Sequence, residues 1–545
     1  MTDELTPRQV AEALGVTPRT VQRWIATGRL PATRVGGRRR VSRSSLSEFT
    51  GEGLGAPPPA SAPAVERIRT LLIANRGEVV GRVARTARRL GVRTIGVQAP
   101  DDLPPRGVDA TLTVSSYLDG KAMIAAAVRA GADAVHPGYG FLAEDPSFAD
   151  VVHAAGLTWV GPPAGSMAAM GDKASARRRA ATLGIPVVPG YDGDQQDDAS
   201  LAAEAKRVGY PLLIKPTGGG GGKGIHRVDS AVELPEALDA ARREAQRAFA
   251  DDRLMLERYL KGARHIEIQV LFDRHGHGIH LGERDCSAQR RNQKIVEESP
   301  APSVSSDLRA RMAAAALQLA ASVGYEGAGT VEFLALDDEF FFLEMNTRLQ
   351  VEHPVTEAVA GRDLVADQLS MAEGSPLPLE QEAVRLAGHA IEARIYAEDP
   401  EAGFLPASGR IVRLQWPEGA GIRVDTGVAE GDPVTDRYDP MLAKIIASGR
   451  NRAEALGRLR EALGSTLILG VRTNLRFLRW LLLQEVASAG EVRTDTVSRL
   501  PLPAPTSLDE ETLRAAAHRL LARGPFRGRS VGRRLARECA GRGPN

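Results

Sequence analysis

Cysteine is scarce in this chain of 545 residues, where Cys286 and Cys539 are the only two. Two cysteines without paired spacing exclude a disulfide framework and a zinc ribbon, and they suit a reducing compartment. No stretch approaches the roughly 18 apolar residues of a membrane-spanning helix. The first residues, Met-Thr-Asp-Glu, lack the basic and apolar regions of a signal peptide. We therefore expect a cytoplasmic protein.

An excess of charge is also missing, because 70 Lys and Arg residues face 68 Asp and Glu residues, for a formal net charge of +2. Global charge therefore gives no reason to expect a nucleic-acid partner. The chain is too long for one domain, and about three or four are expected. Its composition is that of an ordinary globular protein, which can bury a sizeable core.

The first fifty or so residues carry the pattern of two short helices followed by a basic hairpin. Thr6, Pro7 and Gln9 form a capping box with proline at the first helical position. Gly15 and Val16 turn the chain, and a second helix is predicted from Thr17-Pro18 to Gly28. The arginine-rich run 34–43 reads as a hairpin, or wing. This is a helix-turn-helix pattern.

The rest of the chain is predicted to alternate strands and helices. A Gly, Pro, Ala and Ser-rich linker precedes it at about 51–66. A strand at Arg69–Ala74, a helix at Glu78–Leu90 and a strand at Arg93–Val97 indicate an open parallel sheet. A mixed region (about 171–372) and an α+β region (about 386–495) follow. The end holds a predicted helix, Asp509–Ala522, and an Arg-rich tail interpreted as a solvated extension.

A run of five glycines is the clearest local signal of chemistry. A strand over Leu212–Lys215 leads into Gly218, Gly219, Gly220, Gly221 and Gly222, and Lys223 follows. Glycines let backbone N–H groups approach phosphate oxygens without obstruction by Cβ atoms. No Ser or Thr follows Lys223, so the run is not a P-loop. A flexible surface linker is the alternative, and a lysine at each end favours phosphate binding.

Two carboxylates lie in apolar runs that read as strands. They are Glu332 and Glu344, and Asn346 follows the second. A buried carboxylate is costly without a cation, and two carboxylates with an amide suit Mg²⁺ bridging nucleotide phosphates. The alternative is that one or both cap a strand or pair with arginine.

Alternating polar residues follow directly. Arg348, Gln350 and Glu352 would face one way on an extended segment. An arginine beside a carboxylate could hold a small anion and deprotonate it, or the run could be a surface salt-bridge ladder. The basic and amide-rich run 282–294 is either a solvated charged face or an anion site. No histidine or base is arranged to make Cys286 a nucleophile.

Taken together, these segments resemble the biotin carboxylase family over roughly residues 68–485. Matching runs include Ile73-Ala-Asn-Arg-Gly-Glu78, His136-Pro-Gly-Tyr-Gly-Phe-Leu142, Gly171-Asp-Lys173, His265-Ile-Glu-Ile-Gln269, 282–300, 344–356, Ala397-Glu-Asp-Pro400 and Tyr438-Asp-Pro-Met441. The resemblance implies a doubly wound N-terminal domain (68–172), an ATP-grasp domain (173–385) with a lid at about 188–259, and a C-terminal α+β domain (386–495). Residues 1–50 would be a small all-α winged helix-turn-helix, 51–67 a linker and 496–545 a tail.

The resemblance also implies residue roles in ATP-dependent carboxylation of biotin with bicarbonate. Glu332, Glu344 and Asn346 would hold Mg²⁺ or Mn²⁺. Lys294 and Arg348 would bind bicarbonate and phosphate, Glu352 would take the bicarbonate proton, Gln350 and the Val351 backbone would orient bicarbonate, and Arg394 would stabilise the biotin enolate. The ATP contacts would be Lys173, Lys215, the glycine loop as a lid, Glu257, Leu260, His265 and Gln289.

Departures and absences limit what the resemblance implies. Asn292 stands where the family usually has histidine, and Gln98-Ala-Pro-Asp-Asp is a shorter turn than the family's. No Ala-Met-Lys-Met biotin-attachment signal occurs, so a biotin carboxyl carrier protein and a carboxyltransferase are expected as separate chains. A homodimer is expected, and the acyl acceptor is left open.

The first fifty residues resemble excisionase-type winged helix-turn-helix modules. That resemblance implies DNA contacts from Arg19, Thr20, Gln22 and Arg23 on the second helix and from Arg38, Arg39 and Arg40 in the wing. A protein-docking module, or a relic with weak non-specific affinity, is the alternative.

Three hypotheses for the whole chain follow. The first is an active biotin carboxylase subunit with an accessory DNA-binding module. The second is a DNA-binding regulator whose carboxylase body senses ATP, bicarbonate or a biotinylated partner. The third is another ATP-grasp ligase of the carbamoyl-phosphate type, which the run from Arg348 to Glu352 disfavours.

Overall fold

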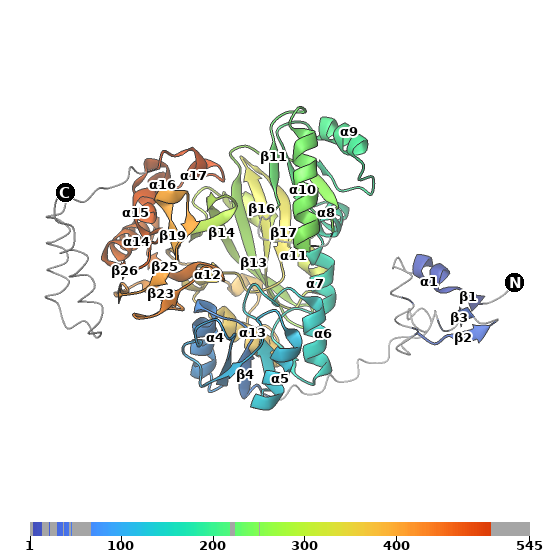
Figure 1. The fold of residues 1–545 in the computed structure, drawn as a ribbon, viewed down its shortest axis with the longest axis horizontal. Helices are drawn as coiled ribbons and strands as arrows, with labels where there is room; N and C mark the ends of the chain where they lie inside the picture. Colours follow the sequence, from blue (N-terminus) through green and yellow to red (C-terminus); the bar gives the residue numbers. More distant parts are fainter. Residues whose placement is uncertain are drawn as a thin grey trace, which may run out of the picture. The chain divides into compact units, whose positions relative to one another are not determined.

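The protein is described by a computed structural model that covers residues 4–13, 21, 25, 30–35, 38–42, 45, 67–217, 224–249 and 251–502 (Figure 1). Its contacts divide the chain into two compact units, Met1–Arg67 and Ile68–Asn545. The predicted helix Asp509–Ala522 lies outside the described residues. Within those ranges, none of the helices combines the length and the apolar character needed to cross a membrane.

The first unit begins with the predicted capping box. Gln9 N–H donates to Thr6 Oγ1 at 3.2 Å and Thr6 N–H donates to Gln9 Oε1 at 2.9 Å, which starts helix α1 (Pro7–Ala13). The basic hairpin is confirmed as β2 (Thr33–Val35) paired with β3 (Arg38–Ser42). A strand that was not predicted, β1 (Glu4–Leu5), pairs with β3.

The core of this unit is small. Val10, Ala11, Val21, Leu30 and Val41 are buried together. Val10, Ala11 and Val21 lie within the two helices predicted for this unit. Val21 and Ile25 are helical, which agrees with the second predicted helix, and the rest of that helix lies outside the described residues.

The second unit begins with a parallel sheet, which confirms the prediction. Its strand order is β6-β5-β4-β7-β8. Alternate residues of β4 enter different cores: Leu71 and Ile73 pack with α4, and Leu72 packs with α5 and α6. Helices therefore cover both faces, which is a doubly wound arrangement. The elements are β4 (Thr70–Ile73), α4 (Glu78–Arg89), β5 (Arg93–Gln98), β6 (Ala110–Thr113), α5 (Gly120–Ala130), β7 (Ala134–His136), α6 (Pro146–Ala154), β8 (Thr158–Trp159) and α7 (Ala164–Gly171).

A small antiparallel sheet follows, in the order β11-β10-β12-β9. It has its own core, in which α9 and α10 pack on β10 and β12 through residues such as Leu201, Leu212 and Leu238. The elements are α8 (Lys173–Thr182), β9 (Gly190–Tyr191), α9 (Asp198–Val208), β10 (Leu212–Pro216), β11 (His226–Val228), α10 (Leu234–Phe249) and β12 (Leu254–Arg258). Residues 218–223, which include the five glycines and connect β10 to β11, lie outside the described residues.

An eight-stranded antiparallel sheet in the order β17-β16-β13-β14-β15-β18-β25-β23 forms the centre of the unit (Figure 1). Helix α11 packs on one part of it and α14 and α15 on another. Its strands are β13 (Arg264–Phe272), β14 (Gly278–Arg290), β15 (Gln293–Ser299), β16 (Gly327–Leu336), β17 (Glu339–Asn346), β18 (His389–Tyr396), β23 (Ile422–Thr426) and β25 (Met441–Gly449).

The remaining elements are short or peripheral to this sheet. The remaining helices of the second unit are α11 (Ser306–Ala321), α12 (His353–Ala360), α13 (Leu364–Ala372), α14 (Arg452–Ser465), α15 (Leu475–Leu483), α16 (Glu485–Ala489) and α17 (Thr496–Arg499). Two-stranded pairs and single turns are β19 (Glu398–Asp399) with β20 (Leu405–Pro406), β21 (Gly409–Arg410) with β24 (Pro433–Val434), β22 (Arg413–Gln415) with β26 (Leu467–Leu469), η1 (Gln381–Ala383) and η2 (Pro400–Ala402).

Candidate active site

A row of charged side chains crosses four neighbouring strands of the large sheet. Glu344 of β17 lies opposite Glu332 of β16, Glu332 opposite Glu267 of β13, and Glu267 opposite Arg284 of β14. Residues directly opposite each other in antiparallel strands share a face of the sheet. Glu332, Glu267 and Arg284 are buried, so this face concentrates negative charge that cations must balance.

Lys294 on β15 is the cation at the centre. Its Nζ lies 2.6 Å from Glu267 Oε2, 2.8 Å from Glu332 Oε1 and 2.7 Å from Glu352 Oε1. Burial disfavours the ammonium, but the three carboxylates outweigh burial and hold the pKa of Lys294 well above its ordinary value. One lysine therefore joins residues from β13, β16 and the start of α12.

Glu352 is held by cations on both carboxylate oxygens. Lys294 contacts Oε1, and Arg394 Nη2 on β18 lies 3.0 Å from Oε2. Burial alone would raise the pKa of Glu352, but Lys294, Arg394 and Arg284 lower it well below the ordinary range. The carboxylate is therefore ionised and aimed at the same place as Lys294 and Arg394.

The run from Arg348 to Glu352 was predicted to be an extended segment. The structure shows a turn instead. Glu352 has φ −82° and ψ 8° and stands at the N-cap of α12. The side chains nevertheless converge: Gln350 Nε2 donates to Glu332 Oε1 at 2.9 Å, and Arg348 Nη2 donates to Asn346 Oδ1 at 2.9 Å. The turn therefore brings together the polar side chains that were expected to face one way on an extended segment.

The predicted metal ligands lie side by side. Glu332 and Glu344 face each other across β16 and β17, and Asn346 Nδ2 donates to Glu332 Oε1 at 2.8 Å. Lys173 Nζ, at the start of α8, lies 2.8 Å from Glu344 Oε2. Two carboxylates and an amide beside a half-buried lysine offer a set of hard oxygen donors that fits a divalent cation such as Mg²⁺.

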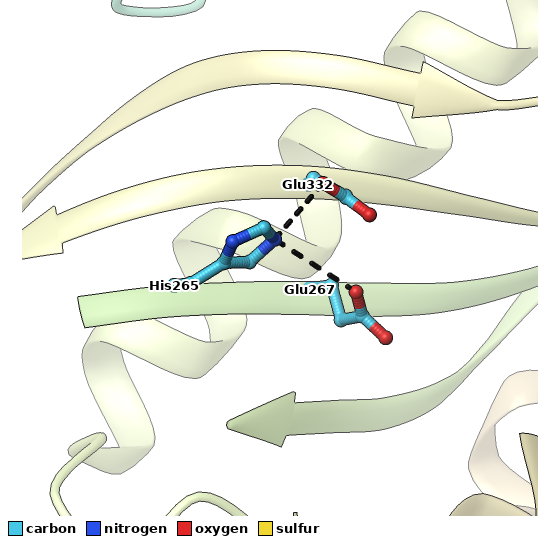
Figure 2. Close-up of side chains that lie close together, drawn as sticks. All are labelled: His265, Glu267 and Glu332. Atoms are coloured by element: carbon cyan, nitrogen blue, oxygen red, sulfur yellow. Dashed lines mark ion pairs between the residues drawn. The ribbon is translucent and has the colours of Figure 1, made fainter. Parts of the chain in front are cut away.

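A second cluster shares Glu332 with this set. His265 points from β13 toward Glu332, and its Nε2 lies 2.9 Å from Glu332 Oε2 and 3.9 Å from Glu267 Oε2 (Figure 2). The ligand atoms of the three residues lie within 4.8 Å of one another. A mixed nitrogen and oxygen set suits Mn²⁺ or Zn²⁺ better than Mg²⁺. Lys294 already donates to both carboxylates, so its ammonium balances this cluster.

The other predicted nucleotide contacts fall into two places. Lys215 on β10 pairs with Glu257 on β12, both buried in the small sheet, and half-buried Leu260 follows β12. Gln289 on β14 lies 3.5 Å from His265 Nδ1, at the large sheet. Lys173 links the two places, because its N–H donates to Thr217 O at 3.3 Å while its side chain meets Glu344.

Four family models match the chain. They are described as the biotin carboxylase N-terminal domain (residues 67–167), the carbamoyl-phosphate synthase L chain ATP binding domain (172–380), the biotin carboxylase C-terminal domain (392–499) and a helix-turn-helix domain (4–52). A biotin carboxylase from Haemophilus influenzae is 45% identical over 418 residues, which are 75% of this chain and 93% of that protein.

The chain belongs to the biotin carboxylase family.

Two further relatives extend this result. The mitochondrial methylcrotonoyl-CoA carboxylase subunit alpha of Glycine max is 48% identical over 439 residues, which are 78% of this chain and 60% of that protein. The chain thus spans about 60% of that longer relative. The biotin carboxylase domain dimer of Hydrogenobacter thermophilus 2-oxoglutarate carboxylase, solved with MgADP, ADP and bicarbonate, has a TM-score of 0.78 and 39% identity, covering 79% of this chain and 98% of that one.

The basic and amide-rich run 282–294 is not a solvated charged face, and the alternative, an anion site, stays a prediction. Glu283, Arg284, Asp285 and Ser287 are buried within β14, so the expectation of a solvated face is wrong. Their charges are paired inside the sheet, as in the Arg284–Glu267 ion pair. Cys286 is also buried, and burial raises the pKa of its thiol well above the ordinary value, which agrees with its rejection as a nucleophile.

The departure at Asn292 has a local cause. Arg291 and Asn292 form the two-residue turn between β14 and β15, with φ of 49° and 64°. A hairpin turn with two positive φ angles favours asparagine, whose short polar side chain tolerates the left-handed region. Asn292 is exposed at the tip of this hairpin.

Sequence reasoning missed several functional-looking residues. Glu267, Arg284 and Glu297 lie within quoted family runs but were given no role, and Glu144 was not considered. Glu297 on β15 pairs with Arg394, and Glu144 Oε2 lies 2.9 Å from Arg348 Nε. Alternation of Glu267 with His265 and Gln269 on an otherwise apolar strand was the signal available for Glu267.

Some predicted residues lie outside what the structure describes. These are Gly218, Gly219, Gly220, Gly221 and Gly222 of the loop and Arg19, Thr20, Gln22 and Arg23 of the second helix. Arg38 begins β3, Arg39 is exposed and Arg40 is half-buried on the same strand. Their DNA contacts stay predictions.

Proposed function

We propose that the chain carboxylates biotin with bicarbonate in an ATP-dependent reaction, as the biotin carboxylase component of an acyl-CoA carboxylase-like system. The observation that carries the proposal is the set formed by Lys294, Glu352 and Arg394, in which one carboxylate is held between two cations. Bicarbonate is a poor electrophile, so it must be activated before biotin can attack it. Transfer of the ATP γ-phosphoryl group gives carboxyphosphate, which releases CO₂ next to biotin.

In the first step, Lys294 and Arg348 bind the two reacting anions, and Glu352 removes the bicarbonate proton. In the structure, the Lys294 ammonium donates its three hydrogen bonds to Glu267, Glu332 and Glu352. An anion that draws Lys294 away from Glu352 removes the largest charge that lowers the pKa of Glu352. The carboxylate then becomes a stronger base at the moment when bicarbonate is bound.

Glu332, Glu344 and Asn346 would hold Mg²⁺ or Mn²⁺, which supplies charge neutralisation for the ATP phosphates when it is bound. Lys173 and Lys215 would contact the same phosphates, and this is supported by the carboxylate beside each lysine, Glu344 and Glu257, which a metal or nucleotide would engage. The small sheet and residues 218–222 would close over ATP and exclude water from carboxyphosphate.

In the second step, Arg394 would stabilise the developing enolate oxygen of biotin. Its guanidinium is buried between Glu297 and Glu352, and these carboxylates hold the pKa of Arg394 well above its ordinary value against burial. A permanently charged donor at this point is suited to a growing negative charge. The biotin would be carried by a separate carrier protein, and the acceptor would be handled by a separate carboxyltransferase. The chain itself would act as a homodimer in a cytoplasmic setting.

The test is ATP hydrolysis with Mg²⁺ and bicarbonate, with and without free biotin. We expect biotin-stimulated turnover that falls at least about 100-fold in Glu352→Gln, while ADP affinity measured by calorimetry is retained. Glu491→Gln, at an exposed position, is the matched control and should behave as the wild type. Absence of bicarbonate-dependent turnover in a folded, ADP-binding wild type, with biotin or a biotinylated carrier domain present, would exclude the proposal.

A second candidate function, DNA binding by the first unit, is favoured by one observation. Arg39 is exposed on β3 within a hairpin that carries neighbouring arginines. We propose that this hairpin contacts phosphates. In gel-shift titrations of the full chain at several salt concentrations, Arg39→Ala should lower the salt slope of log Kd by about one. Arg450→Ala, a control whose side chain is 89% exposed in the second unit, should leave the slope unchanged. If the hairpin does not contact DNA, the wild type and Arg39→Ala will have equal salt slopes of log Kd.

A further inference from the structure

The backbone of the turn that precedes α12 is held at two successive carbonyl groups. Lys444 Nζ on β25 donates to Val351 O at 2.7 Å. His353 Nδ1 lies 2.7 Å from Gln350 O. Gln350 and Val351 are the residues predicted to orient bicarbonate, so both of their peptide carbonyls are bound by groups with no predicted role.

The direction of the histidine hydrogen bond follows from its surroundings. Arg82 Nε donates to His353 Nε2 at 3.1 Å. Burial, together with the charges of Lys444, Arg82 and Arg423, lowers the pKa of His353 well below its ordinary value. A neutral ring that accepts at Nε2 carries its proton on Nδ1, and Nδ1–H therefore donates to Gln350 O.

Lys444 is fixed just as firmly. It is fully buried, its Nζ lies 3.3 Å from Glu78 Oε1 and 4.0 Å from Asp425 Oδ2, and it stands opposite Arg394 on β18 and Asp425 on β23. A lysine buried at this cost gives little net stability compared with an apolar residue of similar size. A buried ammonium at this position is better explained by what it holds in place, which is Val351 O.

Because the carbonyl groups of Gln350 and Val351 are held in place, the directions of the N–H groups that follow them are fixed as well. In a trans peptide, the C=O and the following N–H point in opposite directions. With Gln350 O bound to His353, the Val351 N–H points away from His353. With Val351 O bound to Lys444, the Glu352 N–H points away from Lys444. Two successive N–H groups fixed in this way form the kind of concavity that binds small anions.

We propose that Lys444 is a positioning residue that locks the Val351–Glu352 peptide, so that the turn presents its N–H groups and the Glu352 carboxylate to bicarbonate. The inference rests on the proposed function, since bicarbonate is the anion concerned. His353 is the second anchor of the same turn. Lys444 contacts the turn, Glu78 and Asp425, so its effect should be specific to the anion that the turn binds.

The test compares Lys444→Met with the wild type and with Lys121→Met, a control at an exposed position on α5. In Lys444→Met, kcat/KM for bicarbonate should fall at least about tenfold, while the Kd for MgADP changes less than about twofold. Amide hydrogen exchange should become faster over residues 347–352 and stay unchanged in β13. Lys121→Met should match the wild type in all three measurements.

Two results would overturn the inference. One is an unchanged kcat/KM for bicarbonate together with unchanged exchange over 347–352. The other is a loss of bicarbonate efficiency and MgADP affinity by the same factor with faster exchange throughout the large sheet, which describes a merely structural lysine. If the wild type shows no bicarbonate-dependent turnover, the proposed function fails, and the exchange experiment still decides whether Lys444 orders the turn.

A second variant covers the case in which Lys444→Met fails to fold because Glu78 is left without a partner. Glu78→Gln combined with Lys444→Met removes both charges, which buried pairs usually tolerate. It should show the same selective loss for bicarbonate. Glu78→Gln alone keeps the donor to Val351 O and should retain kcat/KM for bicarbonate within about threefold of the wild type. Equal activity of the double variant and Glu78→Gln would contradict the inference.

Discussion

At the scale of single residues, the site is a balance of buried charge. Glu267, Glu332 and Glu352 meet at Lys294, and removal of that one cation leaves three carboxylates without their shared partner. Breaking a buried ion pair from one side is more damaging than replacing the whole pair, because the remaining charge is uncompensated.

We therefore expect Lys294→Met to abolish turnover and to lower the free energy of unfolding by about 3 kcal/mol or more at neutral pH. The loss of stability should shrink as the pH is lowered, because the pKa values of Glu332 and Glu352 would rise in the variant and the carboxylates would then accept protons. Urea unfolding at several pH values measures this. Lys206→Met, at an exposed position on α9, is the control. A destabilisation below about 1 kcal/mol would show that Lys294 is not a structural counter-charge.

At the scale of elements, β15 and β18 place two acids face to face. Glu297 lies directly opposite Glu392, and Glu297 Oε2 and both Glu392 oxygens have no hydrogen-bond partner in the described part of the chain. Burial raises the pKa of Glu297 to about 7, although Arg394 acts in the opposite direction. Burial also raises the pKa of Glu392 well above its ordinary value.

This pair predicts how stability depends on pH. A folded-state pKa above the unfolded value of 4.5 means that the folded protein binds more protons, so the stabilisation is complete below that value and is lost as the pH rises through about 7. In Glu297→Gln the decline in unfolding free energy between about pH 5 and 8 should be shallower. Denaturant unfolding across that range measures it, beside Glu491→Gln. An equally steep decline in both variants would show that Glu297 is ionised throughout.

Element prediction succeeded where local signals are strong. The capping box at Thr6 and Gln9 and the arginine hairpin need only neighbouring residues to form, and the strand before α4 is marked by its short apolar run. It failed at the turn from Arg348 to Glu352, and at the run 282–294 it could not decide between a solvated charged face and an anion site. Both depend on contacts with strands far away in sequence, such as the Glu267 row that buries Arg284. Alternation cannot distinguish a buried charged strand from an exposed one.

Residues of the candidate active site were likewise predictable only where the local sequence signal is strong. Residues with strong family motifs, such as Glu332 and Glu352, are brought together by the fold. Residues that hold them, such as Lys444 and Glu297, carry no local sequence signal for their roles. Their roles follow from register across the sheet, which a single sequence does not contain.

At the scale of the whole molecule, the two compact units have separate cores. All described residues of the candidate active site lie between Lys173 and Lys444, in the second unit. The first unit has its own small core around Val10 and Val41. No described residue of the candidate active site lies in this first unit.

We therefore expect a chain that begins at Arg67 to keep bicarbonate-dependent ATP turnover within about twofold of the full chain, because every described site residue lies in the second unit, which has its own core. Its main thermal transition should also be unchanged, while DNA retention, if present in the full chain, should be lost. Parallel assays of the two proteins decide this. A large fall in turnover would show that the first unit contributes to catalysis.

The large sheet has a consequence for recombination between relatives. Strands β13 to β17 fall within the region that matches the ATP-binding family model, but β15 pairs directly with β18 of the following region. A chimaera joined near residue 385 would have to reproduce that pairing, because a slip of one residue would turn Arg394 to the opposite face. The carboxylase body is therefore inherited or exchanged as one piece, whereas the boundary at Arg67 crosses no described strand and leaves the first unit free to be gained or lost.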